Sequence, residues 1–191
     1  MTIKRWFEDY VFEVPDFLPA LRCDELIAHA ERVGFEEATV NMAGGNIRRE
    51  NLRNNDRVIS DDTDLSAQMW ALAKPHVPAR FKGRTAVGLN ERLRFYRYDP
   101  GQKFDWHQDG YFERENGERS QFTFMVYLND GYSGGGTSFV DPYGRMFDPF
   151  TVVPSRGSAL FFYHQLDHRG DELIEGRKYV LRSDVMYSLP S

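Results

Sequence analysis

The chain has 191 residues, of which 41% are hydrophobic and 15% aromatic, a composition that suits one compact domain with a substantial core. Its net charge of −5 argues against a general nucleic-acid binder, and it contains no apolar run long enough to span a membrane. Cys23 is the single cysteine, which excludes an intramolecular disulfide, and without a signal-peptide pattern we expect a cytoplasmic protein.

Three elements are predicted in the N-terminal part of the chain. Residues 11–18 have the pattern of an edge strand that ends where a proline follows. Residues 24–33 have the spacing of an amphipathic helix, and Gly34 supplies the stop at its C-terminal end. A second helix is predicted over about 63–74, because prolines follow it.

Short strands separated by Gly, Pro, Asn and Asp turns occupy the chain from Val87 onward, a pattern typical of an all-β sandwich. Helices that precede an antiparallel strand series predict an α+β, mainly β fold. We therefore expect a double-stranded β-helix, or jelly roll, with supporting N-terminal helices. Residues 1–191 would form a single domain, with helical support and edge strands in 1–86 and the jelly-roll core in 87–188.

Two distant segments contain the residues with the strongest chemical signal. His107 and Asp109 are spaced to share one face of a strand, whereas His168 and Lys178 follow much later in the chain. Two imidazoles and one carboxylate on one face of a metal leave positions open for other ligands, unlike a four-ligand structural zinc site. The His-x-Asp spacing alone carries little weight, so its context decides. His164, although four residues before His168, lacks the helical context of a zinc pair.

Five ordered segments, within residues 90–188, resemble the catalytic core of the prolyl 4-hydroxylase-like branch of the Fe(II)/2-oxoglutarate-dependent dioxygenases. They are Tyr98–Asp109 (YDPGQKFDWHQD), Met125–Asn129 (MVYLN), Gly134–Phe139 (GGGTSF), Gly157–Phe162 (GSALFF), and His168 with Lys178. Five matches in the right order are much more specific than any one of them.

The resemblance implies a cofactor set and a role for each matching residue. Fe(II) would be held by His107, Asp109 and His168, with 2-oxoglutarate and O₂ as co-substrates. Lys178 would pair with the distal carboxylate of 2-oxoglutarate, because a buried anion without a cation is costly. Tyr98 and Tyr127 would donate hydrogen bonds to the same co-substrate.

The implied reaction is hydroxylation of an aliphatic carbon with release of succinate and CO₂. The substrate would be an amino acid, a small metabolite or a peptidyl residue. Two alternatives remain: a cupin-like non-oxidative metal-binding or sensor protein, and an oxygenase that demodifies protein or nucleic acid. An inward Lys178 argues against the first, and the acidic net charge argues against a nucleic-acid partner. No membrane association is expected.

The chain departs from the family pattern at three positions. Phe104 stands where several relatives have a tyrosine. Arg182 and Asp184 stand where some peptide prolyl hydroxylases have a threonine and a tryptophan. Opposite charges on an inward strand face are rarely buried unless they are paired. Either they pair with each other, or they recognise a polar or zwitterionic substrate.

A basic run at residues 46–57 contains Arg48, Arg49 and Arg53. Charge runs of this kind are usually solvated loop surface. The resemblance adds a second interpretation, in which these arginines lie over the mouth of the active site and contact an anionic or peptide substrate.

The loop at residues 110–119 is polar and contains two glycines, and it lies between the expected metal ligands in the sequence. Such a loop fits either a lid that closes over the site or a plain connection between strands. The triple glycine at 134–136 most simply relieves a tight turn or a bulge.

Overall fold

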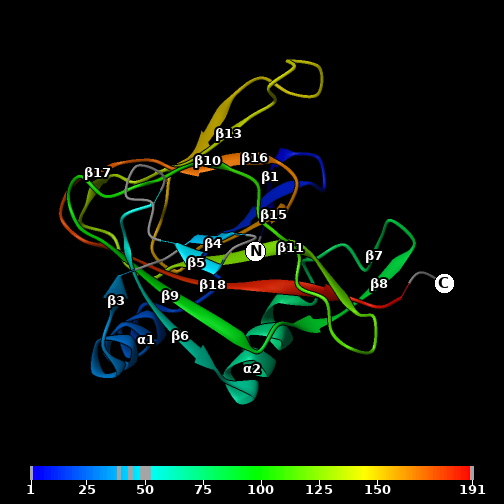
Figure 1. The fold of residues 1–191 in the computed structure, drawn as a ribbon, viewed down its shortest axis with the longest axis horizontal. Helices are drawn as coiled ribbons and strands as arrows, with labels where there is room; N and C mark the ends of the chain where they lie inside the picture. Colours follow the sequence, from blue (N-terminus) through cyan, green and yellow to red (C-terminus); the bar gives the residue numbers. More distant parts are fainter. Residues whose placement is uncertain (1, 38–39, 43–44, 48–52, 190–191) are drawn as a thin grey trace.

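The computed structural model describes residues 2–37, 40–42, 45–47 and 53–189, and most of its strands lie in two antiparallel sheets (Figure 1). The large sheet has the strand order β1 (Lys4–Phe7), β2 (Val11–Val14), β15 (Ala159–Tyr163), β11 (Arg119–Tyr127), β18 (Lys178–Tyr187), β9 (Arg92–Tyr98), β6 (Asp56–Asp61) and β3 (Glu36–Glu37). At one end of β18, the strand β8 (Arg84–Leu89) pairs with it and also with β7 (Arg80–Phe81).

The small sheet has four strands and lies opposite the large one. Its order is β10 (Phe104–His107), β16 (Asp167–Gly170), β13 (Thr137–Val140) and β14 (Phe150–Val152). Two two-stranded sheets complete the strands: β12 (Ser133–Gly134) with β17 (Leu173–Glu175), and β4 (Val40–Met42) with β5 (Gly45–Ile47).

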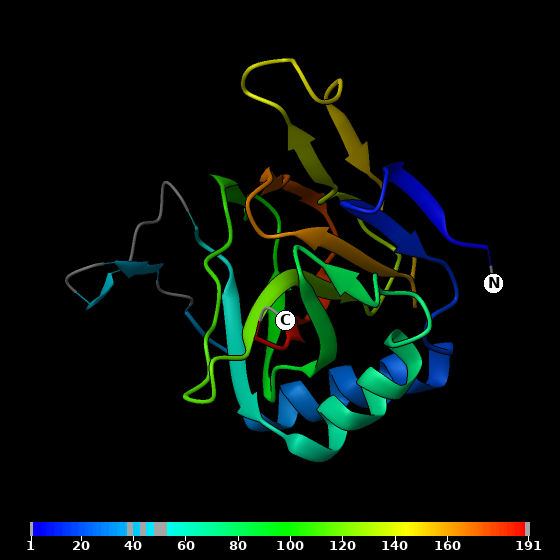
Figure 2. The same ribbon diagram turned by 90° about the vertical axis from the view of Figure 1, so that its right-hand side faces the viewer.

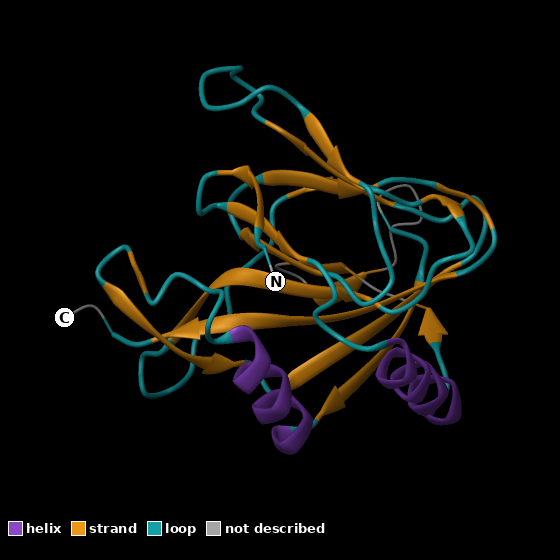
Figure 3. Ribbon diagram, turned by 180° about the vertical axis from the view of Figure 1, so that it is seen from behind, coloured by secondary structure: helices purple, strands orange, loops and turns teal. Residues whose placement is uncertain are grey.

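The predicted double-stranded β-helix with helical support is confirmed. Helices α1 (Ala20–Val33) and α2 (Thr63–Ala73) lie on the same side of the large sheet, and the small sheet lies on the other side (Figures 2 and 3). This order of layers leaves the space between the two sheets for a site. Within the described residues, no helix combines the length and apolar character that crossing a bilayer requires.

Both helices end near their predicted positions. Gly34, with a φ of 95°, follows the last turn of α1 and donates its N–H to the carbonyl of Ala30, as a glycine stop requires. The start of α1 lies at Ala20, four residues before the predicted one, because Pro19 at the N-cap is compatible with a helix start. Helix α2 begins after Asp62, whose carboxylate accepts a hydrogen bond from the Leu65 N–H at 2.8 Å.

The predicted edge strand at residues 11–18 is wrong in its position within the sheet. Strand β2 spans Val11–Val14 only and is flanked by β1 and β15, so it is an inner strand. All four residues of β2 are buried, including Glu13, which accepts a hydrogen bond from the Trp6 indole at 3.4 Å. The polar start of β1 gave no strand signal in the sequence, and without its partner β2 resembles an edge.

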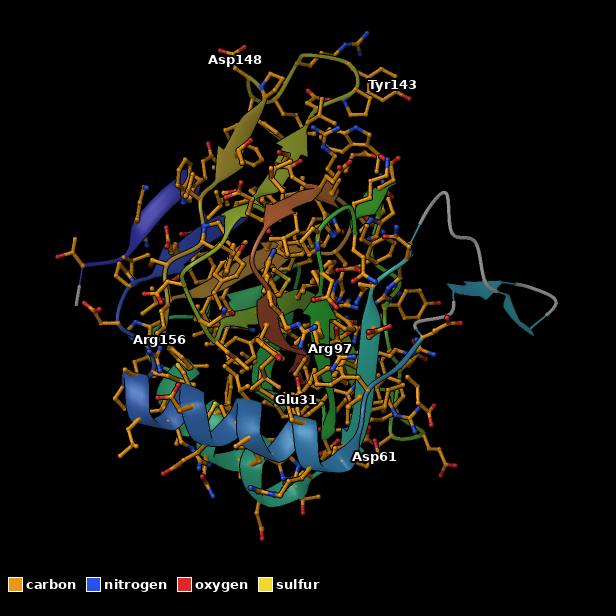
Figure 4. The ribbon with its side chains drawn as sticks, turned by 90° about the vertical axis from the view of Figure 1, so that its left-hand side faces the viewer. Glu31, Asp61, Arg97, Tyr143, Asp148 and Arg156 are labelled. Atoms are coloured by element: carbon orange, nitrogen blue, oxygen red, sulfur yellow. The ribbon has the colours of Figure 1, made fainter. Side chains whose placement is uncertain are left out.

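Strand β9 shows how alternation divides the two faces of the large sheet. Tyr96 and Tyr98 line cavities between the sheets. Arg97, between them in the sequence, points toward α1, where its guanidinium lies 3.3 Å from the Glu31 carboxylate and 2.9 Å from that of Asp56 (Figure 4). A strand with a period of two therefore serves the site on one face and fixes a helix on the other.

Replacing Asp62 with alanine should lower the free energy of unfolding by about 1 kcal/mol, because the cap of α2 is lost. Asp62→Asn, which keeps an oxygen acceptor, should stay within a few tenths of wild type. Urea denaturation followed by circular dichroism measures both. Equal losses for the two variants would contradict the capping role.

Candidate active site

Two imidazoles face each other across neighbouring strands of the small sheet. His107 ends β10 and His168 lies in β16, and the antiparallel register places these two residues directly opposite each other. Their ring centroids are 4.2 Å apart. The Phe104 ring stacks on the His107 ring with centroids 3.5 Å apart, and the Phe162 ring packs against His168 at 4.4 Å. Each imidazole is thus in contact with a phenylalanine ring.

The outer nitrogen of each ring is already used by a backbone carbonyl. His107 Nδ1 lies 2.7 Å from the Asp105 carbonyl, and His168 Nδ1 lies 2.9 Å from the Leu166 carbonyl. A carbonyl accepts only, so Nδ1 carries the hydrogen and Nε2 keeps its lone pair, as in a metal-binding histidine. Burial lowers the pKa of both rings, for His107 to about 3, so both are neutral ligands at physiological pH.

Asp109 completes the donor set from a different position than expected. Strand β10 ends at His107, so Asp109 lies in the following loop, where its N–H donates to the His164 carbonyl at 2.9 Å. Its Oδ1 is 3.7 Å from His107 Nε2, and its Oδ2 is 3.6 Å from His168 Nε2. Among the described residues, these three form the one cluster of metal-binding side chains, with ligand atoms within 4.8 Å of one another. Two neutral imidazoles and a carboxylate suit Fe(II).

Both oxygens of Asp109 also have partners outside the donor set. Arg182 Nη2 lies 2.9 Å from Oδ1, and the Thr123 hydroxyl donates to Oδ2 at 2.5 Å. Burial raises the pKa of Asp109, but the Arg182 guanidinium and the neighbouring histidines together outweigh burial and hold the pKa below its ordinary value. The carboxylate is thus ionised and oriented.

A buried hydrogen-bonded row extends from Asp109 through Thr123. The Thr123 hydroxyl lies 3.0 Å from His164 Nδ1, and His164 Nε2 lies 2.9 Å from the Ser120 hydroxyl. His164 is 2% exposed and lies outside the cluster of three side chains that could hold a metal. It contacts Asp109 indirectly, through the Thr123 hydroxyl. Sequence reasoning missed Thr123, because only the pairing of β11 with β15 and β18 brings it to the site.

Lys178 is part of the wall of a narrow cavity between the sheets. The cavity has a volume of about 40 Å³, and His107, Asp109 and His168 also line it. Lys178 is 3% exposed, and its ammonium donates to the Gly135 carbonyl at 2.5 Å. Burial lowers the pKa of Lys178 to about 8, and Asp171 opposes part of this shift.

The glycine at position 135 is required by this arrangement. Its φ is +64°, and a Cβ built there would lie 3.2 Å from the Cδ of Lys178. The predicted turn role of the glycine run is therefore accompanied by a packing role against the lysine side chain.

Two tyrosines flank the lysine side chain. The Lys178 ammonium lies 5.2 Å from the ring centroid of Tyr98 and 5.3 Å from that of Tyr127. Burial raises the pKa of Tyr98 to about 12 and also raises that of Tyr127, so both hydroxyls keep their protons. The Tyr127 hydroxyl forms a 2.7 Å hydrogen bond with the hydroxyl of Thr137, a cavity residue that sequence reasoning missed.

Arg182 and Asp184 are close to each other, yet each has a nearer partner. Their guanidinium and carboxylate are 3.5 Å apart. Asp184 also accepts from Arg94 and Asn90, each at 3.2 Å, whereas Arg182 lies nearest to Asp109. The pairing expected from the sequence is therefore one part of a wider charge network.

A second, wider cavity of about 490 Å³ shares a wall with the narrow one. Its lining residues are Arg53, Arg57, Arg92, Arg94, Tyr96, Phe104, His107, Gln108, Asp109, Gly110, Tyr111, Phe112, Arg182 and Asp184. Arg53 is thus brought to the site, whereas Arg48 and Arg49 lie outside the described residues.

The loop at residues 110–119 is tied to its surroundings. The Phe112 N–H donates to the Ser120 hydroxyl at 2.8 Å, and the Arg114 guanidinium lies 2.5 Å from both the Glu91 and Glu118 carboxylates. Tyr111 and Phe112 form part of the wall of the wider cavity.

The sequence matches a family model and several known enzymes. The model of the 2OG-Fe(II) oxygenase superfamily matches residues 93–183. Prolyl 4-hydroxylase 13 of Arabidopsis thaliana is 25% identical, with 89% of this chain and 68% of the relative covered. Prolyl 4-hydroxylase 2 of the same plant is 26% identical, with 89% and 64% covered.

Solved structures show the same fold at lower sequence identity. A viral collagen prolyl hydroxylase from Paramecium Bursaria Chlorella virus-1, in complex with 2OG, has a TM-score of 0.66 at 20% identity, with 94% of this chain and 97% of the other covered. A Pseudomonas putida prolyl-4-hydroxylase has a TM-score of 0.68 at 20% identity, with 92% and 91% covered. A prolyl hydroxylase from Trichoplax adhaerens, in complex with a hypoxia inducible factor peptide fragment, has a TM-score of 0.72 at 14% identity, with 93% and 84% covered.

The comparisons and the donor set agree on the cofactors, which are Fe(II) and 2-oxoglutarate with O₂ as oxidant. Together these matches identify the chain as a 2-oxoglutarate-dependent dioxygenase of the prolyl 4-hydroxylase-like type.

Proposed function

We propose that this protein hydroxylates an aliphatic carbon of an amino acid, a small metabolite or a peptidyl residue. The observation that supports the proposal best is that three side chains able to bind a metal and a buried cation line the same cavity. A metal-binding protein without a 2-oxo acid would have no use for Lys178 at 3% exposure.

Bound Fe(II) would supply the redox chemistry by which O₂ oxidises 2-oxoglutarate to succinate and CO₂, while the second oxygen atom enters a C–H bond of the substrate. In the proposed assignment, His107, Asp109 and His168 hold the metal. The residues of this chain contribute position and exclusion of water rather than covalent chemistry.

Lys178, Tyr98 and Tyr127 would bind the distal carboxylate of 2-oxoglutarate. The lysine ammonium can exchange its present acceptor, the Gly135 carbonyl, for a carboxylate oxygen, which is a stronger, charge-assisted partner. The two tyrosine hydroxyls, with their raised pKa values, would donate hydrogen bonds without losing their protons.

Arg182 and Thr123 would orient Asp109 for the metal. Each contacts one of the two carboxylate oxygens, so together they fix its plane. We further propose that the described residues act as one catalytic domain. Strands β2 and β6, from the first third of the chain, pair with β15 and β9 in the sheet that bears Lys178.

Metal binding tests the ligand assignment. His107→Ala and Asp109→Ala should each weaken Mn(II) binding more than about 100-fold, because loss of a ligand exceeds the effect of losing a supporting hydrogen bond. Isothermal titration calorimetry measures the affinity, and circular dichroism verifies the fold. His76→Ala, distant from the cluster in the chain, should bind Mn(II) like wild type. Wild-type affinity in both ligand variants would overturn the assignment.

The lowered pKa of Lys178 predicts how 2-oxoglutarate binding depends on pH. A carboxylate partner favours the protonated lysine, so affinity is full below the pKa of about 8 and is lost as the pH rises through it. The dissociation constant on Mn(II)-loaded protein should rise about tenfold from pH 7 to pH 9.

Lys178→Arg is the matched control, because arginine stays protonated over this range. Its dissociation constant should change little between the two pH values. A parallel loss of affinity in the variant would assign the pH effect to another group.

The reaction itself is tested by succinate release from Fe(II)-loaded protein with 2-oxoglutarate and O₂, with and without pooled free amino acids and small metabolites. His107→Ala is the blank. Stimulation by the pool indicates a small substrate, whereas slow release that depends on His107 directs the search to peptides and proteins. No release above the blank in either case would reject the proposed function.

A further inference from the structure

The wider cavity lies where a substrate must lie if the proposed function holds. It shares Tyr96, Phe104, His107, Asp109 and Arg182 with the narrow cavity of Lys178. A molecule held there therefore has direct access to the metal ligands, while 2-oxoglutarate would occupy the deeper position. A volume of about 490 Å³ is in the usual range for small-molecule sites.

The wall of this cavity has more positive than negative charge. Its described lining contains five arginines, whereas the carboxylates are Asp109 and Asp184. Those two carboxylates are already used, because Arg182 contacts both and Arg94 contacts Asp184. Arg92 forms a salt bridge at 3.0 Å with Asp61, a residue that does not line the cavity.

Arg53 is the arginine whose surroundings point most directly to an anion. It is 6% exposed, and its guanidinium lies between the rings of Tyr96, at 4.5 Å, and Phe104, at 4.6 Å. Its Nε donates to the neutral Asn55 side chain at 2.7 Å, and its Nη2 is buried with no hydrogen-bond partner among the described residues. A guanidinium stays charged at any physiological pH, so a buried one favours an anionic partner.

The pKa of Tyr96, which also lines the wider cavity, is affected by the same arginines. Its hydroxyl accepts a hydrogen bond from Arg182 at 3.3 Å, and Arg53 stacks on its ring. Burial raises the pKa of Tyr96, but Arg182, Arg53 and Arg94 together outweigh burial and lower it to about 8. An oxygen-bearing anion beside Tyr96 would be stabilised by the same three cations.

We propose that the substrate carries a carboxylate, which Arg53 binds in the wider cavity, and that this contact places the carbon to be hydroxylated toward His107 and Asp109. A guanidinium held against two rings presents its donors in a restricted orientation, which suits a planar carboxylate. Asp184 already has Arg94, Asn90 and Arg182 as partners, so it is not available to bind an ammonium group of the substrate. The carboxylate of the substrate is therefore the group that this cavity recognises. This inference rests on the proposed function.

The test compares matched acids and amides on protein loaded with Mn(II) and 2-oxoglutarate, which does not turn over. One set of probes consists of free amino acids and their amides, and the other of short peptides with a free or an amidated C-terminus. Calorimetry gives the ratio of the two dissociation constants for each pair. In wild type, at least one acid should bind tenfold or more tightly than its amide, and the set that contains it identifies the source of the carboxylate.

Arg53→Met removes the charge but keeps an unbranched apolar side chain between the two rings, and it should bring that ratio close to one. Arg22→Met changes the net charge equally on the exposed side of α1 and should leave the ratio unchanged. Should Arg53→Met not fold, Arg53→Lys keeps the charge without the planar fork and should reduce the ratio several-fold.

Equal binding of acids and amides in wild type, absence of any acid binding, or an undiminished ratio in Arg53→Met would each overturn the inference. These outcomes are separate from failure of the proposed function, which appears as absence of His107-dependent succinate release. A protein that releases succinate but does not distinguish acids from amides keeps the function and loses the carboxylate contact.

Discussion

Burial of two cations on one strand is the constraint on which the site depends. Strand β18 places Lys178 and Arg182 four residues apart, and both line the narrow cavity between the sheets. A buried cation is costly unless an anion or strong acceptors surround it. Arg182 meets this need with Asp109 and Asp184, whereas within the described part of the chain Lys178 has only a backbone carbonyl as its hydrogen-bond acceptor. The same strand thus holds one satisfied cation next to the metal and one that a dicarboxylate co-substrate would satisfy.

Local patterns and the order of the matching segments predicted much of the fold and the candidate residues of the site. The two helices and the jelly-roll fold followed from local patterns. The resemblance of ordered segments pointed to His107, His168 and Lys178, which line one cavity in the structure. Contacts set by strand register did not follow. The partner of Arg182 is Asp109, 73 residues earlier, and no local pattern relates the two. Thr123 was likewise missed, because its role depends on which strands flank β11. The edge-strand prediction failed for the same reason, since β1 gave no recognisable signal.

The two departures from peptide prolyl hydroxylases change the wall that faces the substrate. Arg182 and Asp184 bring charge to positions where a threonine and a tryptophan stand in some relatives, and Arg94 extends this charge network across to β9. The wall also keeps apolar surface, because Tyr111 and Phe112 line the same cavity. A substrate for this cavity would therefore combine an anionic group with an apolar part, and the shared fold does not by itself make it a prolyl peptide.

Phe104 links the two cavities mechanically. One ring stacks on the imidazole of His107 at 3.5 Å and also lies against the guanidinium of Arg53 at 4.6 Å. Lacking the hydroxyl found at this position in several relatives, the ring is fixed by its faces and not by a hydrogen bond. A ligand that moved the Arg53 guanidinium would change the packing of Phe104. The same Phe104 ring stacks on His107. Occupancy of the outer cavity would therefore bear on the orientation of this imidazole, and on the direction of its lone pair, through a single aromatic side chain.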